Sequence, residues 1–473
     1  MRTNPFVKKL ASSPNDPEQL RAEKHHRMTT APIRSLILSM AVPTIISMTI
    51  TSVYNFADTW FISHIGEGAT RAVAAVGVIF SYMAIIHATG FFFGHGSGNF
   101  ISRALGRQEV NKASQMAATG VVSSFLFGIV IALIGILAPH PLLTLLGTSP
   151  EIYRETYDYF FYICLATPFM TTSLVFNNQL RLQGNAHRGM IGIAIGAILN
   201  IALDPIFIFS LNMGISGASL ATAISQIIGF LVLLIMTHCG DSITPKLKNF
   251  RPTLNNYREI IAGGLPSLAR QSLNAIAAIV INRYALDYGA QALAGVSIVA
   301  RIMALLFCIV VGIGQGFQPV CGFNYGARRF DRVEKAYFET IKINTVVVIF
   351  FFILLNALAS QLVGLFGSSA ETADIAIRAL HYQTSSVPFL GFIVATEMML
   401  QNTRQTIKAS VLAVMRRGLA YAPCIIVLNA MFELDGILWS KPAADFIALL
   451  FAVPFSILMV RKLRRMMQDV SQA

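Results

Sequence analysis

The sequence predicts an all-α membrane protein with about twelve transmembrane helices arranged in two pseudo-symmetric six-helix lobes. Of its 473 residues, 55% are hydrophobic and only 12% are charged, whereas soluble domains carry about 25% charged residues. Apolar runs of about 20 residues, which suffice to cross a bilayer as a helix, recur along nearly the whole chain. Membrane-crossing strands would instead give alternating segments of about ten residues, and the sequence has none.

Hydropathy gives the order of the predicted helices, which are separated by polar loops. The twelve apolar segments are 36–62, 75–102, 114–137, 158–181, 190–211, 217–238, 259–285, 294–321, 340–364, 378–401, 408–431 and 437–460. Every second connection is basic: the arm 1–34, the loops around Arg103, Arg181, Lys246, Arg328 and Arg404, and the tail 462–473. Because loops rich in Lys and Arg stay in the cytoplasm, both termini are predicted to be cytoplasmic.

An internal repeat predicts the two lobes. The paired features lie about 220 residues apart: GHGSGNFISRALG (94–106) with GQGFQPVCGFNYG (314–326), Pro43 with Pro266, and Pro168 with Pro388. The predicted parts are a cytoplasmic N-terminal arm (1–34), an N-lobe (35–239), a cytoplasmic linker (240–258), a C-lobe (259–461) and a cytoplasmic tail (462–473). Parallel repeats with a central site at their interface are a transporter architecture.

Two carboxylates lie inside predicted spans of the N-lobe. They are Asp58, in TSVYNFADTWFIS, and Asp204, in ILNIALDPIFIF. Asn200 precedes Asp204 by four residues and therefore shares its helix face, and Pro205 leaves a backbone carbonyl without its usual donor. A carboxylate at the bilayer centre costs at least about 2.5 kcal/mol, so we expect these acids to hold a proton or a hard cation, for which oxygen ligands are suited.

The C-lobe has different charges at the corresponding positions. The counterpart of the first acid is Ile281, and that of the second lies near Pro423. The C-lobe has acids of its own, Glu397 and Asp445, which we expect to form internal ion pairs because unpaired charges at that depth are penalised. A local pair of Asp445 with Lys441 is the simplest expectation, and Glu397 could instead meet a cationic substrate.

The same observations exclude several classes of function. The net charge of +13 comes from residues in short loops between apolar segments, not from one face of a soluble nucleic-acid-binding domain. The five cysteines show no CxxC spacing, which argues against a zinc site or a disulfide framework. No GxxxxGK[ST] motif for ATP occurs, and no nucleophile–base or metal constellation is recognisable. We therefore expect neither an enzyme nor a cofactor.

Several stretches together resemble the multidrug and toxic compound extrusion (MATE) family, and most closely its MepA-type bacterial branch. They are AVPTIISMTITSVYNFADTWFIS, NIALDPIFIF, GISGASLATAIS, GIGQGFQPVCGFNYGA and GILWSKPAADF. The resemblance implies twelve helices in two lobes that form a V, and export of organic cations driven by entry of Na⁺ or H⁺. It places Asp58, Asn200, Asp204 and Thr222 at the N-lobe cation site. Some members carry a further acid in span seven, which here reads LARQSLNAIAAIVINRY and has none.

The sequence therefore predicts an antiporter that exports organic, mostly cationic drugs in exchange for H⁺ or Na⁺. The four N-lobe residues would be the metal ligands if the ion is Na⁺, and Tyr54, Gln315 and Glu397 are candidates for the substrate cavity. The expected partners are small-molecule drugs and the lipid bilayer, around a monomer in a bacterial inner membrane. The alternative is a lipid-linked saccharide flippase, for which Arg270, Arg283 and Arg301 could bind a pyrophosphate head group.

Overall fold

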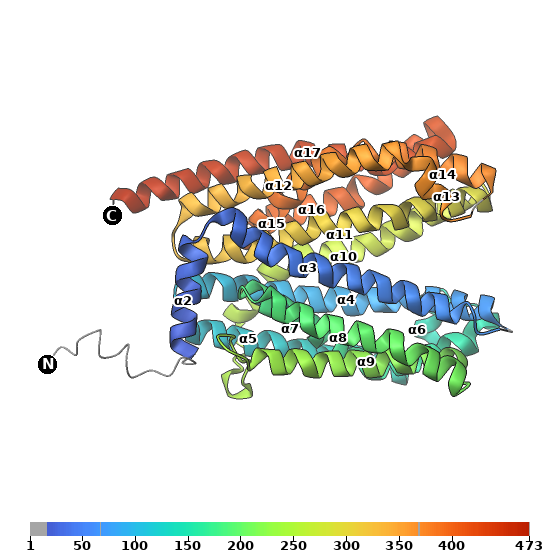
Figure 1. The fold of residues 1–473 in the computed structure, drawn as a ribbon, viewed down its shortest axis with the longest axis horizontal. Coiled ribbons are helices and arrows are strands. Elements are labelled where there is room, and N and C mark those ends of the chain that lie inside the picture. The colour runs from blue at the N-terminus through green and yellow to red at the C-terminus, as the bar shows by residue number, and fades with distance from the viewer. Residues whose placement is uncertain (1–16, 67, 368, 473) are drawn as a thin grey trace.

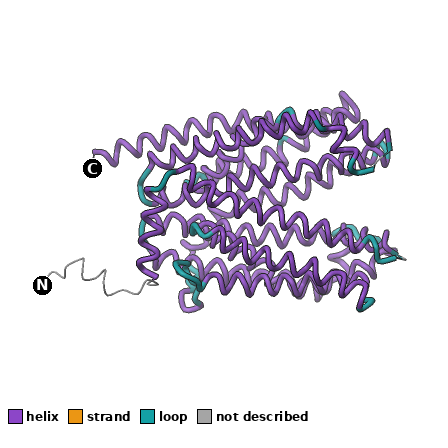
Figure 2. The backbone as a smooth tube through the Cα atoms, viewed as in Figure 1, coloured by secondary structure: helices purple, strands orange, loops and turns teal. Residues whose placement is uncertain are grey.

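The computed structural model describes residues 17–66, 68–367 and 369–472, and these residues form long helices joined by short loops, with no strand among them (Figures 1 and 2). The helices before the central loop are α2 (Pro17–Thr30), α3 (Ile33–Ile62), α4 (Ala69–Gly106), α5 (Val110–Leu137), α6 (Pro139–Leu145), η1 (Pro150–Ile152), α7 (Tyr153–Leu182), α8 (Ala186–Pro205), η2 (Ile206–Ser210) and α9 (Gly214–Thr237). We refer to α3–α9 as the N-lobe.

The remaining helices follow the central loop. They are η3 (Leu247–Asn249), α10 (Leu254–Leu286), α11 (Ala290–Gly326), α12 (Phe330–Ala357), α13 (Ala359–Gly364), α14 (Ala370–Thr384), α15 (Val387–Asn402), α16 (Thr406–Val414), η4 (Met415–Leu419) and α17 (Tyr421–Gln472). We refer to α10–α17 as the C-lobe. The two groups of helices converge at the end where α2 lies and diverge toward the end where α13 lies, as a V (Figure 1); these are called the α2 end and the α13 end.

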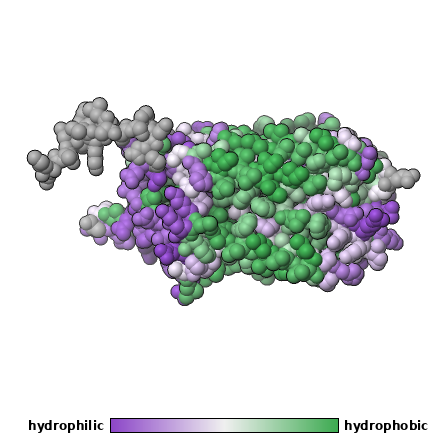
Figure 3. Space-filling model, turned by 90° about the horizontal axis from the view of Figure 1, so that it is seen from below, coloured by the Kyte–Doolittle hydropathy of each residue, from purple (hydrophilic) through white to green (hydrophobic). Residues whose placement is uncertain are grey.

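The fold is that of a polytopic membrane protein. Nine helical segments within the described ranges are long and apolar enough to cross a bilayer, and their apolar surface forms a belt between two hydrophilic ends (Figure 3). The last of these segments contains two crossings, because α17 bends at Glu433, whose φ of 51° and ψ of −130° are not helical. Beyond the bend the chain returns, since Asp445 contacts Arg416.

Two further helical passages bring the fold to the twelve that the sequence predicts. One is α10, which carries Arg270 and Arg283 within its length. The other is the passage formed by α14 and α15, predicted as one helix at 378–401 but broken at Ser385 and Ser386. Pro388, in the first turn of α15, explains this break, because proline is accommodated at the start of a helix and disrupts its interior.

The helices extend beyond the apolar segments that predicted them. The arm 1–34 contains α2, which the sequence analysis did not predict and which lies across the ends of the other helices (Figure 1). Residues 1–16 of the arm lie outside the described part of the chain. Helix α10 begins inside the predicted linker, and α17 continues through the predicted tail to Gln472. Hydropathy detects only the part of a helix that is buried in lipid, so the polar ends were missed.

The glycines of the repeat hold the lobes together at the α2 end. Gly106 of α4 and Gly326 of α11 occupy corresponding positions and form a reciprocal contact: a Cβ at Gly106 would clash with the carbonyl oxygen of Phe323, and one at Gly326 with that of Arg103. Small residues allow helix backbones to approach this closely in a membrane. The glycine motifs that revealed the repeat are therefore also where the lobes touch.

Candidate functional site

The two carboxylates predicted from the sequence are buried in the N-lobe. Asp58 of α3 is 6% exposed and Asp204 of α8 is fully buried. Asn200, one helical turn before Asp204, and Thr222 of α9 are also buried. Tyr159 of α7, which the sequence analysis did not single out, completes the cluster. The site is thus built from four helices that all belong to the N-lobe.

Hydrogen bonds connect these five side chains. The Tyr159 hydroxyl donates to Asp58 Oδ2 over 3.2 Å. Asn200 Nδ2 donates to Asp204 Oδ1 and to Thr222 Oγ1, each over 3.2 Å. Tyr159 also contacts Thr222, and the two carboxylates interact electrostatically. The two acids therefore belong to one connected cluster.

Three oxygen atoms of the cluster have no hydrogen-bond donor. They are Asp58 Oδ1, Asn200 Oδ1 and Asp204 Oδ2, all buried. Neither carboxylate has a Lys, Arg or His within 4.0 Å among the described residues. Buried polar atoms are nearly always hydrogen-bonded, so each exception calls for an explanation. Three acceptors without donors in one cluster can take up a proton or coordinate a cation.

The backbone beside Asp204 departs from the α-helix. Helix α8 ends at Pro205, and the next five residues, Ile206–Ser210, form a π-turn. Proline has no N–H to donate to the preceding turn, and π-turns within helices are frequent at functional sites. The local sequence therefore gives the acid-bearing helix a bend at the point where the carboxylate lies.

The three residues predicted for a substrate cavity lie in different places. Tyr54 is one turn before Asp58 on α3, and Gln226 Nε2 donates to its hydroxyl over 3.4 Å. Gln315 of α11 lies at the contact between the lobes, where its carbonyl oxygen accepts a hydrogen bond from Arg181. Glu397 of α15 is paired with Arg270 of α10 at 2.7 Å, so its charge is already neutralised. Only Tyr54 adjoins the acid cluster.

A buried polar network joins the lobes and was missed by sequence reasoning. Arg181 of α7, which we had assigned to a basic loop, is 2% exposed. Its guanidinium donates to Gln318 Oε1 over 2.8 Å and lies 2.9 Å from His95 Nε2. The other ring nitrogen of His95 lies 2.9 Å from the Ser267 hydroxyl of α10. Because Arg181 ends an apolar run, hydropathy alone could not distinguish it from a loop residue.

A second inter-lobe contact is ionic. Arg103, which was also assigned to a loop, is 3% exposed and pairs with Glu259 of α10 at 2.9 Å. Arg404 binds the other oxygen of the same carboxylate. Together with the glycine contacts, these bonds close the α2 end of the molecule.

The acids of the C-lobe are paired, as expected, but one partner differs from the prediction. Asp445 pairs with Arg416 of η4 at 2.7 Å and accepts a hydrogen bond from Ser386 over 3.0 Å. The expected local pair with Lys441 is wrong, since Lys441 instead donates to Gln383 over 3.5 Å. Spacing along one helix predicts only local pairs, and the η4 turn brings a closer cation from another segment.

The sequence of this chain matches the model of a known protein family in both lobes. The MatE family model matches residues 43–206 and again 266–426. The two matches begin at Pro43 and Pro266, which the internal repeat had paired.

Within the described residues no cluster of three or more His, Cys, Asp or Glu side chains could hold a metal ion, so any cation at the N-lobe cluster would rely on amide and hydroxyl oxygens as well as two carboxylates.

Relatives cover almost the whole chain. The multidrug export protein MepA of Staphylococcus saprophyticus is 28% identical over 420 residues, which are 88% of this chain and 92% of the relative. MepA of Staphylococcus aureus is 25% identical over 438 residues, or 92% of this chain and 96% of the relative. A solved outward-facing multidrug resistance MATE family transporter is 24% identical and superimposes with a TM-score of 0.86 over 93% of this chain and 99% of that chain.

Proposed function

The chain belongs to the MatE family, and from this we propose that it is a secondary antiporter that exports organic, mostly cationic drugs in exchange for H⁺ or Na⁺. The relatives named as multidrug export proteins support the substrate class. The N-lobe cluster supports the coupling. We further propose that the protein lies in a bacterial cell membrane with both termini in the cytoplasm, because Lys and Arg concentrate in the connections at the α2 end.

The observation that carries the coupling proposal is the set of three buried oxygens without donors at Asp58, Asn200 and Asp204. Two interacting carboxylates in a medium of low dielectric cannot both remain ionised at low cost. Binding of a proton or of Na⁺ relieves this repulsion and satisfies the unpaired acceptors. The occupancy of the site by the ion should therefore depend on the ion concentration on the side of the membrane to which the site is open.

Coupling requires that ion and drug favour different states of the protein, because a ligand shifts an equilibrium only through its differential affinity. The bend at Pro205 and the π-turn after it provide a segment beside Asp204 whose packing can depend on the charge of the cluster. We propose that ion entry repacks this segment and releases the drug from the N-lobe. One charge that crosses 100 mV supplies about 2.3 kcal/mol.

Alternating access also requires the α2 end to open. The contacts that close it, Arg181 with His95 and Arg103 with Glu259, are polar. They can exchange protein partners for water, whereas a tightly packed apolar seam would have to expose its surface. In the orientation proposed above, the conformation described here is closed toward the cytoplasm.

The proposal is tested by reconstituting the purified protein in liposomes and following uptake of rhodamine 123, a cationic dye. A pH gradient and a Na⁺ gradient are imposed separately, and we expect at least one of them to drive dye accumulation. Asp58→Asn and Asp204→Asn should abolish this transport, whereas Glu151→Gln, which changes an exposed acid of the same lobe, should retain it. If neither gradient moves the dye and both aspartate variants match the parent, the carboxylates are structural and the antiporter proposal fails.

The flippase alternative receives less support. The three arginines that suggested a pyrophosphate site do not converge, because Arg283 is exposed and contacts Asp287, and Arg270 is paired with Glu397. The relatives above are named for drug export. Arg301 lies elsewhere, in a cavity of the C-lobe.

A further inference from the structure

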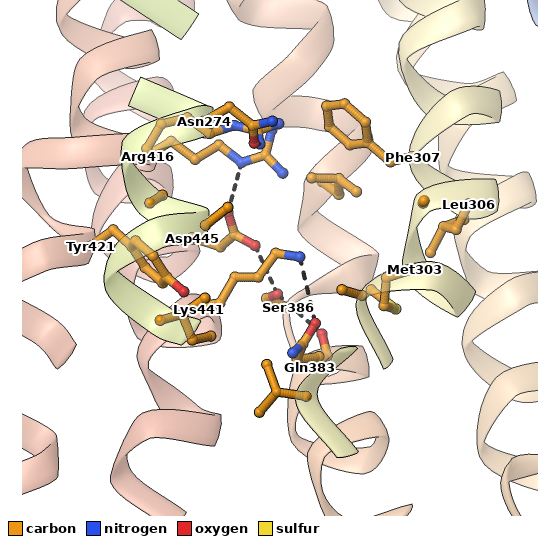
Figure 4. A pocket seen from close by; sticks show the side chains of 18 of the residues that line it. Asn274, Met303, Leu306, Phe307, Gln383, Ser386, Arg416, Tyr421, Lys441 and Asp445 are labelled. Atoms are coloured by element: carbon orange, nitrogen blue, oxygen red, sulfur yellow. Dashed lines mark hydrogen bonds and ion pairs between the residues drawn. The ribbon is translucent and has the colours of Figure 1, made fainter. Parts of the chain in front are cut away.

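The C-lobe contains a cavity of about 520 Å³ that is separate from the N-lobe acid cluster. It lies between α10, α11, α14, α15, η4 and α17, and no residue that lines it belongs to the N-lobe (Figure 4). Its volume falls within the roughly 300–1,000 Å³ typical of small-molecule sites. The cavity is large enough to hold a drug-sized molecule.

The charged side chains that line the cavity are mostly cationic. Four of them are cations and one is a carboxylate: Arg301, Arg416, Arg417, Lys441 and Asp445. The carboxylate is already paired with Arg416. Arg417 donates to the neutral side chain of Asn274, and Lys441 donates to that of Gln383.

The cavity therefore carries a formal charge of +3. Arg301, Arg417 and Lys441 have no carboxylate within 4.0 Å among the described residues. Cations without counter-charges are costly inside a membrane protein unless water or an anion reaches them. Arg417 and Lys441 both line the cavity, where such an anion can reach them.

The opposite wall, formed by α11, is mostly apolar although it also carries Arg301. Met303, Leu306 and Phe307 of α11 face the polar side chains of η4 and α17 across the cavity (Figure 4). The guanidinium carbons of Arg416 and Arg417 lie 5.7 and 4.7 Å from the centre of the Phe307 ring, which is within the range of cation–π contact. The aromatic ring thus marks the point where the cationic wall meets the apolar one.

We propose that this cavity binds an anionic amphiphile, with its carboxylate, sulfonate or phosphate at Arg417 and Lys441 and its apolar body against α11. Arg offers a planar pair of donors that matches such groups, and Lys adds a compact charge. The inference rests on the proposed export function and extends its substrates from organic cations to anionic compounds. The acidic N-lobe would then receive cations, and the C-lobe cavity the opposite charge.

The test compares two dyes of the same ring type and opposite charge. Binding of fluorescein, an anionic xanthene, and of rhodamine 123 is measured by fluorescence anisotropy on the purified protein in phosphatidylcholine nanodiscs without any gradient. Arg417→Gln and Lys441→Gln should each weaken fluorescein binding about tenfold, the effect of losing one hydrogen bond to a charged group. Rhodamine 123 binding should stay unchanged or tighten.

Further variants separate charge from packing. Arg417→Lys keeps the charge and should keep most of the fluorescein binding. Arg283→Gln removes a cation from the same lobe whose side chain is 73% exposed and outside the cavity, and it should leave both dyes unaffected. If both cavity variants bind fluorescein like the parent, or lose both dyes equally, the anion site does not exist.

Two sources of the anionic group are distinguished by the lipid. Replacing part of the phosphatidylcholine by phosphatidylglycerol should weaken fluorescein binding if a lipid head group occupies the site, and should leave it unchanged if the site takes a soluble drug. Failure of this inference is separable from failure of the proposed function. A protein that transports rhodamine 123 along an ion gradient, but whose fluorescein binding ignores Arg417 and Lys441, retains the antiporter function and lacks the anion site.

Discussion

The two lobes bend the same helix of the repeat and place opposite charges beside the bend. In the N-lobe, α8 ends at Pro205 directly after Asp204 and continues as the π-turn η2. In the C-lobe, α16 continues as the π-turn η4, which carries Arg416 and Arg417. A π-turn thus interrupts the corresponding helix in both halves, although not at the same turn, whereas the charges beside it differ. A duplicated scaffold can carry one ion-coupling site and, in its second copy, a site of reversed polarity.

The lobes also differ in how they treat their buried acids. Glu397 and Asp445 of the C-lobe each form an ion pair with an arginine at 2.7 Å. Asp58 and Asp204 of the N-lobe have only neutral partners and retain unpaired oxygens. Pairing fixes the protonation state of an acid, and absence of pairing leaves it free to change. The contrast therefore supports the proposal that the N-lobe acids couple transport to the ion.

The largest expected effect concerns the free energy of unfolding, and removal of a buried acid should lower it only in the C-lobe. Glu397→Gln leaves the Arg270 guanidinium buried without its partner and should lower the free energy of unfolding by about 3–5 kcal/mol. Asp58→Asn removes an unpaired buried carboxylate and should leave stability unchanged or raise it. Thermal unfolding of the detergent-solubilised variants measures both effects.

A double variant is the control for this first prediction. Replacing both partners, as in Arg270→Met with Glu397→Met, should recover most of the lost stability, because apolar residues of similar size often substitute for a buried ion pair without loss. If Asp58→Asn destabilises the protein as much as Glu397→Gln does, the N-lobe acids are held as firmly as those of the C-lobe. The contrast between the lobes would then be invalid.

Much of this contrast could be predicted from the sequence. The twelve passages and the N-lobe acids follow from hydropathy and from the cost of a charge in an apolar run. Arg181 could not be predicted, because a cation at the end of an apolar run looks the same whether it enters water or a neighbouring helix. The pairing of Asp445 with Arg416 also escaped, since the two lie 29 residues apart and only the fold brings them together.

Outside the membrane, the first half of the chain also contains an acid that is paired with cations, Asp241. Asp241, in the loop after α9, binds Lys24 of α2 and lies 2.8 Å from Arg188. Burial alone would raise the pKa of the Asp241 carboxyl, but Lys24 and Arg188 more than offset this and hold it below 3.8. Burial lowers the pKa of Lys24 from 10.5 to about 8, although Asp241 opposes the shift.

The second prediction follows from the pKa of Lys24. Between pH of about 8 and 10.5 the unfolded chain keeps the Lys24 proton and the folded protein does not. The free energy of unfolding therefore rises with pH across this window, by on the order of 3 kcal/mol in total. Lys24→Met should remove that rise. Thermal unfolding at several pH values should therefore show that the stability of the parent increases with pH relative to that of the variant.

Asp241 contributes at the other end of the pH scale. Because its folded pKa is depressed, its stabilisation is present above pH of about 4 and is lost as the pH falls through the folded value.

As a control for the alkaline window, Lys112→Met changes an exposed lysine that pairs with Glu109 and should not reproduce the effect of Lys24→Met. Equal pH profiles for the two lysine variants would contradict the assignment of the alkaline rise in stability to Lys24.

The smallest expected effect concerns the hydroxyl of Tyr159, which donates to an N-lobe acid. Tyr159 Oη donates to Asp58 Oδ2 over 3.2 Å and also contacts Thr222, so it links the α3 acid to the Asn200 side of the cluster. Tyr159→Phe removes the hydrogen bond to Asp58, worth about 1 kcal/mol, together with the contact to Thr222, and leaves the ring in place. We expect gradient-driven uptake of rhodamine 123 in liposomes to slow about fivefold, with no comparable loss of stability.

The matched control is another buried tyrosine of the same lobe. The Tyr82 hydroxyl lies 3.2 Å from the Thr167 hydroxyl and accepts from Cys164 Sγ over 3.4 Å. It contacts neither aspartate, so Tyr82→Phe also removes buried hydrogen bonds and should leave the transport rate nearly unchanged. The distinction depends on the acids, because only Tyr159 acts on a group whose charge must change during transport. If the two variants slow transport equally, the hydroxyl of Tyr159 serves packing alone, and the unpaired oxygens of Asp58 and Asp204 have to perform the coupling without it.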